Sequence, residues 1–334
     1  MIRLIVRRLL QLIPTLFGLS LLLFIWLHRL PGGPETAILG ERGTPELREA
    51  VRRSLGLDQP LWVQYGRFLG RLVTGDLGVS IQTHRPVWTE FAERFPGTVE
   101  LTIVAMAIAV SVGIPLGYLA ARRRGTWLDN LAVGGALFGI CIPIFFLAYM
   151  LRLVFSVHLG WFPTTGRQTV GINATRVTGF FVLDGLLTRE WDAAWDALWH
   201  LILPGIALAS IPLAIITRMT RASVLEVLGE DYVRTAEAKG LTARVIRQRH
   251  VLRNALLPVV TTIGLLTGGL LSGAVLTETV FAFNGIGHFV AAAIPARDYP
   301  VLMTFIMIIA LIYVLVNLLV DISYTLIDPR VRVR

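Results

Sequence analysis

Six runs of apolar residues divide the chain into alternating apolar and polar stretches. The runs cover residues 9–27, 101–120, 131–157, 198–217, 259–281 and 301–326. Each is about 20 residues long or longer, which is enough for a helix to cross a bilayer core of about 30 Å. Because lipid offers no hydrogen bonds to the backbone, each run is expected to be helical. The pattern therefore predicts an all-α membrane protein, with six transmembrane helices in a single domain that covers residues 1–334.

The basic residues are distributed unevenly among the polar stretches. If the N-terminus is cytoplasmic, the cytoplasmic segments hold 17 Lys and Arg residues, and the outer segments hold 4 when the long first one is set aside. Short cytoplasmic loops of membrane proteins carry such an excess. We therefore predict that both termini and residues 218–257 are cytoplasmic, whereas residues 30–97 and 158–197 are periplasmic. The first run is too long for a cleaved signal peptide, so we interpret it as a retained span.

The two outer regions carry helical and aromatic patterns. In the first, Pro45 stands where a helix begins and Gly56 where it stops, and residues 60–72 and 86–94 repeat apolar positions at helical spacing. These segments predict amphipathic helices at the outer membrane boundary. The second region contains four tryptophans, Trp161, Trp191, Trp195 and Trp199. Such residues commonly anchor at lipid headgroups, although a docking surface for another protein is an open alternative.

The composition supports a membrane protein and excludes several other classes. Apolar residues make up 54% of the chain, and the mean hydropathy is +0.67. The net charge of +9 follows the loops and accompanies no nucleic-acid motif, so we expect no nucleic acid as a partner. A single cysteine, Cys141, excludes an intrachain disulfide. No phosphate-binding loop, nucleophile elbow or pair of metal-spaced histidines occurs, so we expect no catalytic residue, no metal and no cofactor on this chain.

One polar stretch, residues 230–258, has more helical character than a linker needs. It contains many good helix formers up to Gly240, which can take the left-handed conformation that ends a helix. Thr242 stands where it could cap a second helix. A helix this short is marginal in water by itself. The segment is therefore predicted to dock on another surface.

Four ionisable residues lie within or beside the apolar runs, namely Glu100, Arg152, Glu278 and Asp321. Charges there are costly and are functional candidates by default. Glu100 and Arg152 stand near the ends of runs, where their side chains can reach the interface. Glu278 ends the fifth run and could pair with a neighbouring helix. Asp321 shares a helix face with Asn317, which favours a structural or gating pair over substrate contact.

The fifth run is rich in glycine, with Gly264, Gly268, Gly269 and Gly273. The spacing of four residues lets helix backbones approach closely. Static packing is one interpretation. Lining a path that opens and closes between two subunits is the other, and it makes Gly264, Gly268 and Gly273 gating candidates together with Glu278 and Asp321.

Several short motifs occur in an order that resembles a known family. They include Pro31-Gly-Gly-Pro34, Leu55-Gly-Leu-Asp-Gln-Pro60, Gly75-Asp-Leu-Gly-Val-Ser80, Arg218-Met-Thr-Arg221, Arg253-Asn-Ala-Leu-Leu-Pro258, Leu276-Thr-Glu-Thr-Val-Phe281 and Arg297-Asp-Tyr-Pro300. The chain resembles the permease subunits of bacterial ABC importers, in the peptide/nickel family and closest to its dipeptide permeases. The resemblance implies the six-helix type I importer permease fold, the inner membrane, and transport of dipeptides or short peptides.

The resemblance also implies a role for residues 230–257 and a set of partners. In such importers a cytoplasmic loop forms a coupling helix that sits in a groove of the ATPase. The matching positions here are Glu230, Asp231, Tyr232, Arg234, Thr235, Ala236, Glu237, Lys239, Gly240 and Leu241. The general pattern has Glu where this chain has Arg234 and Ala where it has Thr235. The expected partners are a homologous second permease, two ABC ATPase subunits that hold ATP and Mg²⁺, a periplasmic substrate-binding protein and the lipid bilayer.

Two kinds of alternative remain open from the sequence. Relatives of the same fold import oligopeptides, nickel chelates or haem-type substrates. A proton-driven secondary transporter belongs to a different class, and it would need carboxylates at the midplane of several spans, which the sequence lacks. A membrane-embedded enzyme is disfavoured by the lack of a polar cluster within the spans.

Overall fold

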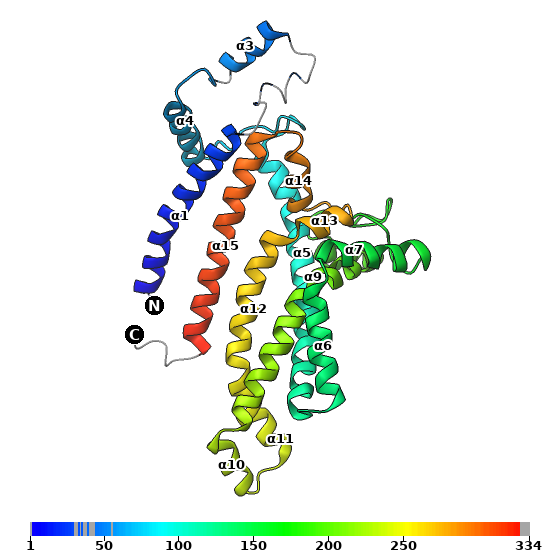
Figure 1. Ribbon diagram of the computed structural model, residues 1–334. Coiled ribbons are helices and arrows are strands. Elements are labelled where there is room, and N and C mark those ends of the chain that lie inside the picture. Colours follow the sequence, from blue (N-terminus) through cyan, green and yellow to red (C-terminus); the bar gives the residue numbers. More distant parts are fainter. Residues whose placement is uncertain are drawn as a thin grey trace.

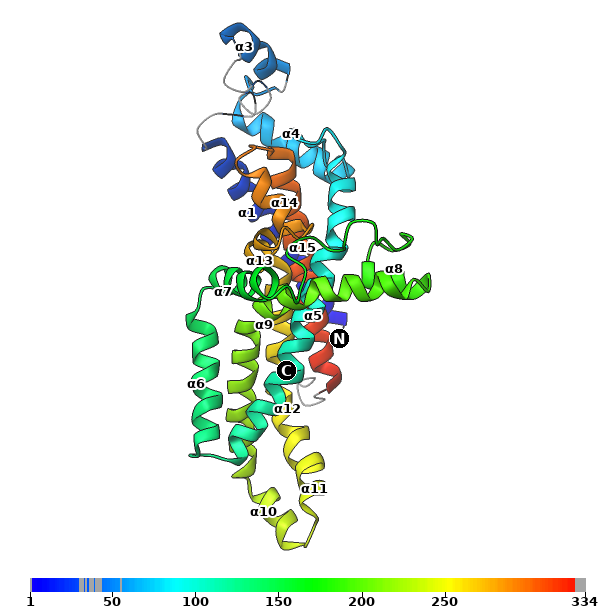
Figure 2. The same ribbon diagram turned by 90° about the vertical axis from the view of Figure 1, so that its right-hand side faces the viewer.

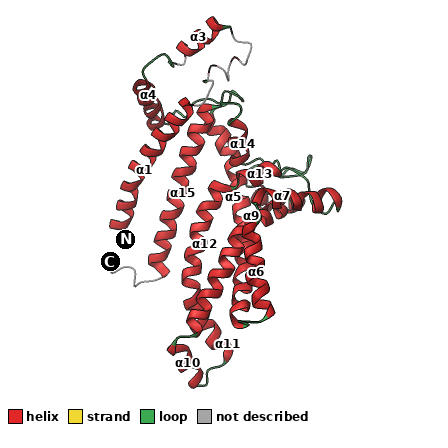
Figure 3. Ribbon diagram, in the orientation of Figure 1, coloured by secondary structure: helices red, strands yellow, loops and turns green. Residues whose placement is uncertain are grey.

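Helices provide the regular structure of the part of the chain that the computed structural model describes, which is residues 2–29, 33, 35, 39, 44–54 and 56–327. The predicted all-α fold class is confirmed. In chain order the helices are α1 (Ile2–Arg29), α3 (Pro45–Ser54), α4 (Leu61–Thr74), α5 (Val87–Arg122), α6 (Trp127–Cys141), α7 (Ile144–Leu151), the π-helical η2 (Arg152–His158), α8 (Phe181–Leu187), α9 (Trp191–Leu228), α10 (Asp231–Ala238), α11 (Ala243–Val245), the π-helical η3 (Ile246–Leu252), α12 (Arg253–Gly273), α13 (Val275–Val280), α14 (Ile286–Ala293) and α15 (Tyr299–Ile327) (Figure 3).

Five described helices are long and apolar enough to cross a membrane, and a bent helix pair makes a sixth candidate. The five are α1, α5, α9, the rod from α11 to α12, and α15. Figure 1 shows α1, α15 and α12 side by side, with α10 at one end of the molecule and α3 and α4 at the other. We call these the α10 end and the α4 end. α1 begins and α15 finishes on the side of the α10 end.

The centre of the bundle is the contact between α5 and α9. Large apolar side chains such as Leu101, Leu208 and Ile216 are fully buried there. Glycines bring the two backbones together: a Cβ on Gly113 would lie 3.1 Å from the Ile216 side chain, and a Cβ on Gly117 would run into the Thr217 carbonyl. Small residues at a helix crossing allow this close packing.

The predicted span over residues 131–157 is a sharply bent helix pair in the structure. The run is broken at Ile142 and Pro143, and the helices before and after the break meet at 100°. Ile142 is extended (ψ 125°), because the proline that follows disfavours helical geometry in the preceding residue. Figure 2 shows α7 lying across the direction of α6.

The structure also corrects the prediction of one span over residues 259–281. α12 ends at Gly273, and the short helices α13 and α14 follow as a hairpin. Glu278, predicted to end the span, lies in α13 and is fully buried. Burying its carboxylate requires several hydrogen-bond donors. The hairpin supplies these donors, whereas a straight helix in lipid would not.

Two other helices extend beyond the predicted spans. α5 starts at Val87. Residues 86–94, predicted as a separate amphipathic helix, are therefore the N-cap and first turns of α5. α9 runs from Trp191 to Leu228 and therefore includes residues assigned from the sequence to both neighbouring loops. Pro204 and Pro212 lie inside it without ending it. Neighbouring helices and local adjustments can satisfy the carbonyls that a proline leaves free.

The helices predicted near the α4 end form where expected. α3 begins at Pro45, and Thr44 accepts a hydrogen bond from the Leu47 N–H at 3.3 Å. Gly56 (φ 69°) follows α3, and Gly75 (φ 76°) ends α4. Both glycines take the left-handed conformation that suits a helix end.

Candidate coupling site

α10 is a short helix with a well-defined end. Gly240 has φ 74°, its N–H donates to the Glu237 carbonyl at 2.9 Å, and the Leu241 N–H donates to the Ala236 carbonyl at 3.3 Å. This pair of bonds is the Schellman motif. The prediction that Gly240 ends a helix is confirmed. A Cβ at Gly240 would meet nothing within 4 Å, so the glycine is required by its backbone angle alone.

One face of α10 is packed against the chain itself. Val233 and Ala236 are buried at 1% and 4% exposure, in a cluster with Val224 of α9 and with Ile246 and Val251 of η3. Positions 233 and 236 are three apart and so lie on the same side of the helix. Ala236 was predicted as a contact residue, and its side chain belongs instead to this internal cluster. The cluster gives α10 a firm backing.

The opposite face of α10 is solvent-exposed and polar. Arg234 and Asp231 are 72% and 97% exposed and lie 3.7 Å apart, an ion pair too exposed to add much stability. Other predicted contact positions on the segment are exposed as well: Glu230, Tyr232, Thr235, Glu237, Lys239, Gly240 and Leu241. The arrangement is a helix fixed on one side and open on the other.

Two features of this segment differ from the sequence expectation. Thr242 precedes α11 in extended geometry, but its side chain makes no capping bond; its carbonyl accepts from the Val245 N–H instead. Asn254 was not predicted as a functional residue. Its amide donates to the Tyr232 hydroxyl and to the His250 carbonyl, both at 3.0 Å. It therefore ties α10 to the start of α12.

A buried ion pair joins α6 to α9 near the α10 end. Arg221 donates from Nε to Asp129 Oδ1 at 2.6 Å and from Nη2 to Oδ2 at 2.8 Å, and the Gly125 N–H donates to the same carboxylate at 2.9 Å. Such a bidentate pair fixes geometry as well as charge. The pair was not predicted because the two residues are far apart in the chain, although Arg221 belongs to one of the family motifs.

Glu278 lies in a network of neutral donors. Its carboxylate accepts from the Thr98 hydroxyl at 2.6 Å and from the His288 N–H at 2.9 Å, while the Ile286 N–H donates to the Thr98 hydroxyl. The N–H groups come from the first turn of α14, where the helix dipole favours a negative charge. Gly285 leaves room for the carboxylate, since a Cβ there would overlap it. Glu278 thus joins α13, α14 and α5.

A second buried carboxylate, Glu100, has a cationic partner. Arg167 donates to it at 2.8 Å and to the Gly179 carbonyl at 3.0 Å, and its guanidinium stacks 3.8 Å from the centre of the Phe181 ring. Burial lowers the pKa of Arg167, and the charge of Glu100 opposes that shift. The pair fixes the loop before α8 to α5. The sequence predicted that the Glu100 side chain could reach the membrane interface. The structure instead buries it against Arg167.

Two glycines of α12, Gly264 and Gly268, face a helix of the same chain. A Cβ on Gly264 would lie 2.5 Å from Val320, and one on Gly268 would lie 3.3 Å from Tyr313; both neighbours belong to α15. Packing inside the chain explains these two glycines. The side chain of Asp321 and the surroundings of Gly273 lie outside what the structure describes.

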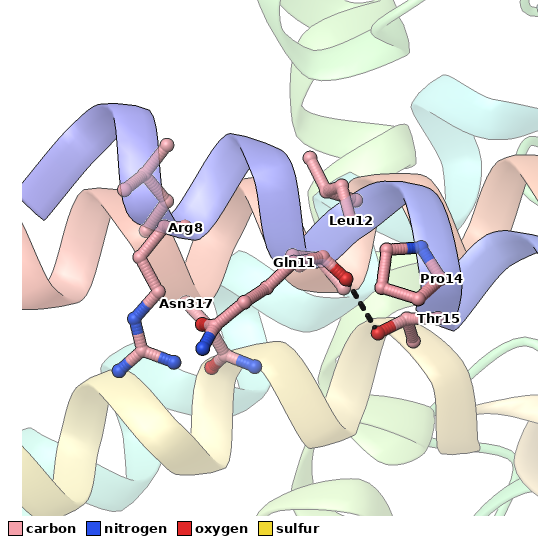
Figure 4. A pocket seen from close by; sticks show the side chains of 8 residues that line it. Arg8, Gln11, Leu12, Pro14, Thr15 and Asn317 are labelled. Carbon is pink, nitrogen blue, oxygen red and sulfur yellow. Dashed lines mark hydrogen bonds between the residues drawn. The ribbon is translucent and has the colours of Figure 1, made fainter.

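A polar hollow of about 410 Å³ lies between α1 and α15. Figure 4 shows Arg8 and Gln11 of α1 extending toward Asn317 of α15. The Thr15 hydroxyl donates to the backbone carbonyl of Gln11 at 2.8 Å, so its hydrogen is not available to a ligand in the hollow. Among the residues that the structure describes, no three His, Cys, Asp or Glu side chains gather as a metal site requires.

Two family models match the sequence. The model of the binding-protein-dependent transport system inner membrane component matches residues 113–333, and the model of the N-terminal part of such membrane components matches residues 1–102. The chain belongs to this family. The recognition of an importer permease from its motifs is confirmed.

Two relatives match this permease over nearly its whole length. "Dipeptide transport system permease protein DppB" of Escherichia coli (strain K12) is 47% identical over an alignment of 336 positions that covers 99% of each chain. The protein of the same name from Alkalihalophilus pseudofirmus is 46% identical over 326 residues, which are 98% of each chain.

A solved structure supports the fold of the permease. An inward-facing structure of the MetNI methionine ABC transporter matches with a TM-score of 0.52 and 17% identity, covering 70% of this chain and 93% of that chain. At this identity the likeness concerns the fold alone. The chain has the type I ABC importer permease fold.

Proposed function

We propose that this chain is one of the two membrane-spanning subunits of an ATP-driven importer that moves dipeptides or short peptides across the bacterial inner membrane. Support for the substrate comes from full-length similarity to two permeases named for dipeptide transport. Support for ATP coupling comes from α10, which is packed on one face and open on the other. That helix is the observation on which the proposal rests.

We propose that the α10 end is cytoplasmic and that the exposed face of α10 sits in a groove of an ABC ATPase. The contact residues would be Glu230, Asp231, Tyr232, Arg234, Thr235, Glu237, Lys239, Gly240 and Leu241. Ala236 supports them from the inner side. Arg234, at the position where the general pattern has Glu, would face acidic groups of the ATPase. The backing cluster lets force on α10 reach α9 and η3 together.

The complete importer would contain four further kinds of component. These are a second homologous permease, two ATPase subunits that bind ATP and Mg²⁺, a periplasmic binding protein that delivers the peptide, and the surrounding lipid. This chain would be non-catalytic, since hydrolysis takes place on the partners. Opening and closing would be a two-state movement of helix bundles.

We propose a different role for the gating candidates. Glu278 anchors the α13–α14 hairpin beside a cavity of about 230 Å³ that Thr98 and Glu278 help to line. A shift of this hairpin would change the cavity. Gly264 and Gly268 keep α12 against α15 and so transmit movement without lining a path. Gating by Asp321 and Gly273 stays a prediction.

The test compares a charge reversal on the exposed face of α10 with one at an exposed arginine outside α10. Arg234→Glu should abolish dipeptide uptake into membrane vesicles and co-purification of the ATPase, while the chain still inserts. Arg123→Glu, on the exposed turn after α5, is the matched control and should retain both. If Arg234→Glu binds the ATPase and transports normally, α10 is not the contact. Uptake that survives ATP depletion and stops with the proton gradient would instead indicate a secondary transporter.

A further inference from the structure

A cavity of about 810 Å³ lies where α4 crosses the ends of two long helices. Its walls come from the end of α1, from α4, from residues 76–81 and from the start of α15. The volume falls within the range of about 300–1,000 Å³ that is typical of small-molecule sites. Figure 1 places α4 beside the ends of α1 and α15, at the level where these membrane helices finish. The cavity therefore lies at the membrane boundary.

The walls are apolar and firmly held. Phe24, Phe68, Leu77 and Met303 line the cavity, and the rings of Phe24 and Phe68 are stacked with centres 6.5 Å apart. The wall of residues 76–81 is tied to the start of α15, because the buried Asp298 carboxylate accepts from the Ser80 hydroxyl at 2.5 Å and from the Gln82 N–H at 3.1 Å. The hollow is thus a fixed part of the fold.

Two arginines stand at this cavity. Arg67 and Arg71 line it from α4, four residues apart and so on one side of the helix, and both are exposed. Within the described residues, neither guanidinium has a hydrogen bond or an ion pair. Among the described residues of the lining the one acid is Asp76, which already accepts from the Gly78 N–H at 3.1 Å.

The neutral polar side chains of the lining are already used inside the chain. His28 pairs with Gln64 at 3.1 Å, Gln64 donates to the Leu57 carbonyl, and Thr304 is 3.3 Å from the Leu77 carbonyl. A peptide backbone in this cavity would therefore find few partners for its N–H and C=O groups, and burying them unpaired is costly. A ligand with an anionic head and an apolar tail would leave no such groups unpaired.

We propose that this cavity binds an anionic phospholipid. The phosphate lies at Arg67 and Arg71, because guanidinium groups form charge-assisted and bidentate bonds with phosphate. An acyl chain lies against Phe24, Phe68 and Met303. The proposal rests on the proposed function in one respect only, the orientation of the chain in the membrane. That orientation puts the bound lipid in the outer leaflet of the inner membrane.

The experiment measures lipid retention by the full-length chain in mild detergent, using native mass spectrometry with added phosphatidylglycerol or phosphatidylcholine. We expect wild type to retain phosphatidylglycerol preferentially. The double variant Arg67→Gln/Arg71→Gln should lower that retention at least about tenfold, since two charge-assisted contacts are lost. Arg53→Gln/Arg176→Gln, two exposed arginines that do not line the cavity, should change it little.

A second pair of variants tests whether lipid occupies the volume of the cavity, independently of the arginine charges. Gly70 lines the cavity and Gly66 does not, and a Cβ at either position meets nothing within 4 Å. Gly70→Phe should fill the space and release lipid, while Gly66→Phe on the same helix should not. Equal retention in both variants overturns the proposal, as does equal affinity for the two lipids. A photoreactive residue at position 70 that cross-links to a protein partner and not to lipid overturns it too. Because no transport is measured, the outcome is independent of the proposed function.

Discussion

The ion pair of Asp129 and Arg221 gives a sharp test of how α6 is held to α9. The Asp129 side chain is 4% exposed and that of Arg221 is 26% exposed. Arg221→Met keeps the length of the side chain and removes both donors. Of the hydrogen bonds described above, the Asp129 carboxylate would then keep only the one from the Gly125 N–H. Breaking a buried pair in this way costs about 3–5 kcal/mol. Since Arg221 is one-quarter exposed and water can reach it, we expect about 3 kcal/mol.

A double-mutant cycle separates the pair from its parts. Asp129→Leu alone leaves Arg221 without its acceptor, at a cost of about 1–3 kcal/mol. The double variant Asp129→Leu/Arg221→Met leaves neither charge of the pair buried. Its loss of unfolding free energy should therefore be smaller than the sum of the losses in the two single variants. Interacting residues commonly deviate from additivity by about 0.5–3 kcal/mol.

The measurement is the thermal unfolding midpoint of the purified chain in lipid nanodiscs, followed by tryptophan fluorescence. Arg218→Met is the matched control: Arg218 is exposed and one turn away on α9, so its replacement should change stability by less than about 0.5 kcal/mol. Additive losses in the double variant would refute the coupling. An Arg221→Met variant as stable as Arg218→Met would refute the burial argument itself.

Three further predictions follow from single observations. Gly240→Ala should loosen the end of α10 by about 1–2 kcal/mol, because φ 74° strains any side chain, and Gly240→Asn should cost less; hydrogen exchange over residues 230–245 measures both. Gly264→Ala should lower the unfolding midpoint by overpacking against α15, whereas Gly269→Ala, with nothing within 4 Å, should not. Hydrogen bonds from the Thr175 N–H and hydroxyl hold the pKa of Glu190 below its usual value. The stabilisation of the loop from Thr175 to Glu190 is therefore fully present above the usual Glu pKa and is lost as pH falls through the lower native pKa. Thr175→Val should move this loss to higher pH, which hydrogen exchange of the loop amides measures.

The apolar runs predicted six spans, because length and hydropathy decide whether a helix can cross a membrane. The described residues hold five such helices, or six if the bent pair is one span. The apolar runs could not locate the breaks. The break between α6 and α7 lies next to Pro143, which immediately precedes α7, yet Pro115, Pro204 and Pro212 lie inside unbroken helices. What decides between these outcomes is whether neighbouring helices satisfy the freed carbonyls, and that depends on tertiary contacts. A single sequence does not contain this information.

The candidate site was predicted in part for the same reason. Helix formers followed by a glycine indicated α10 and its end, since these effects are local. The sequence did not show which face is packed, because Val233 and Ala236 become internal only when η3 folds back on them. For Glu278 the sequence predicted a partner on a neighbouring helix but not which groups would supply it. The structure supplies the Thr98 hydroxyl from α5 and the His288 N–H from α14.

The contacts of the α10 end indicate which parts can move as one body. α10 is fixed to α9 and η3 by the apolar cluster, α9 is fixed to α6 by the Asp129–Arg221 pair, and α9 approaches α5 through glycines. We therefore expect a force on α10 to move these helices together as one rigid group. The chain does change direction after α12, where Ala274 leads into α13 and the hairpin is held by Glu278. Since Ala274, Phe281 and Phe283 belong to the same apolar core as α5 and α9, we expect α13 to move with this group. The cavity beside Glu278 is also lined by Ile306 and Ile309 of α15, so it should change when the group moves against α15.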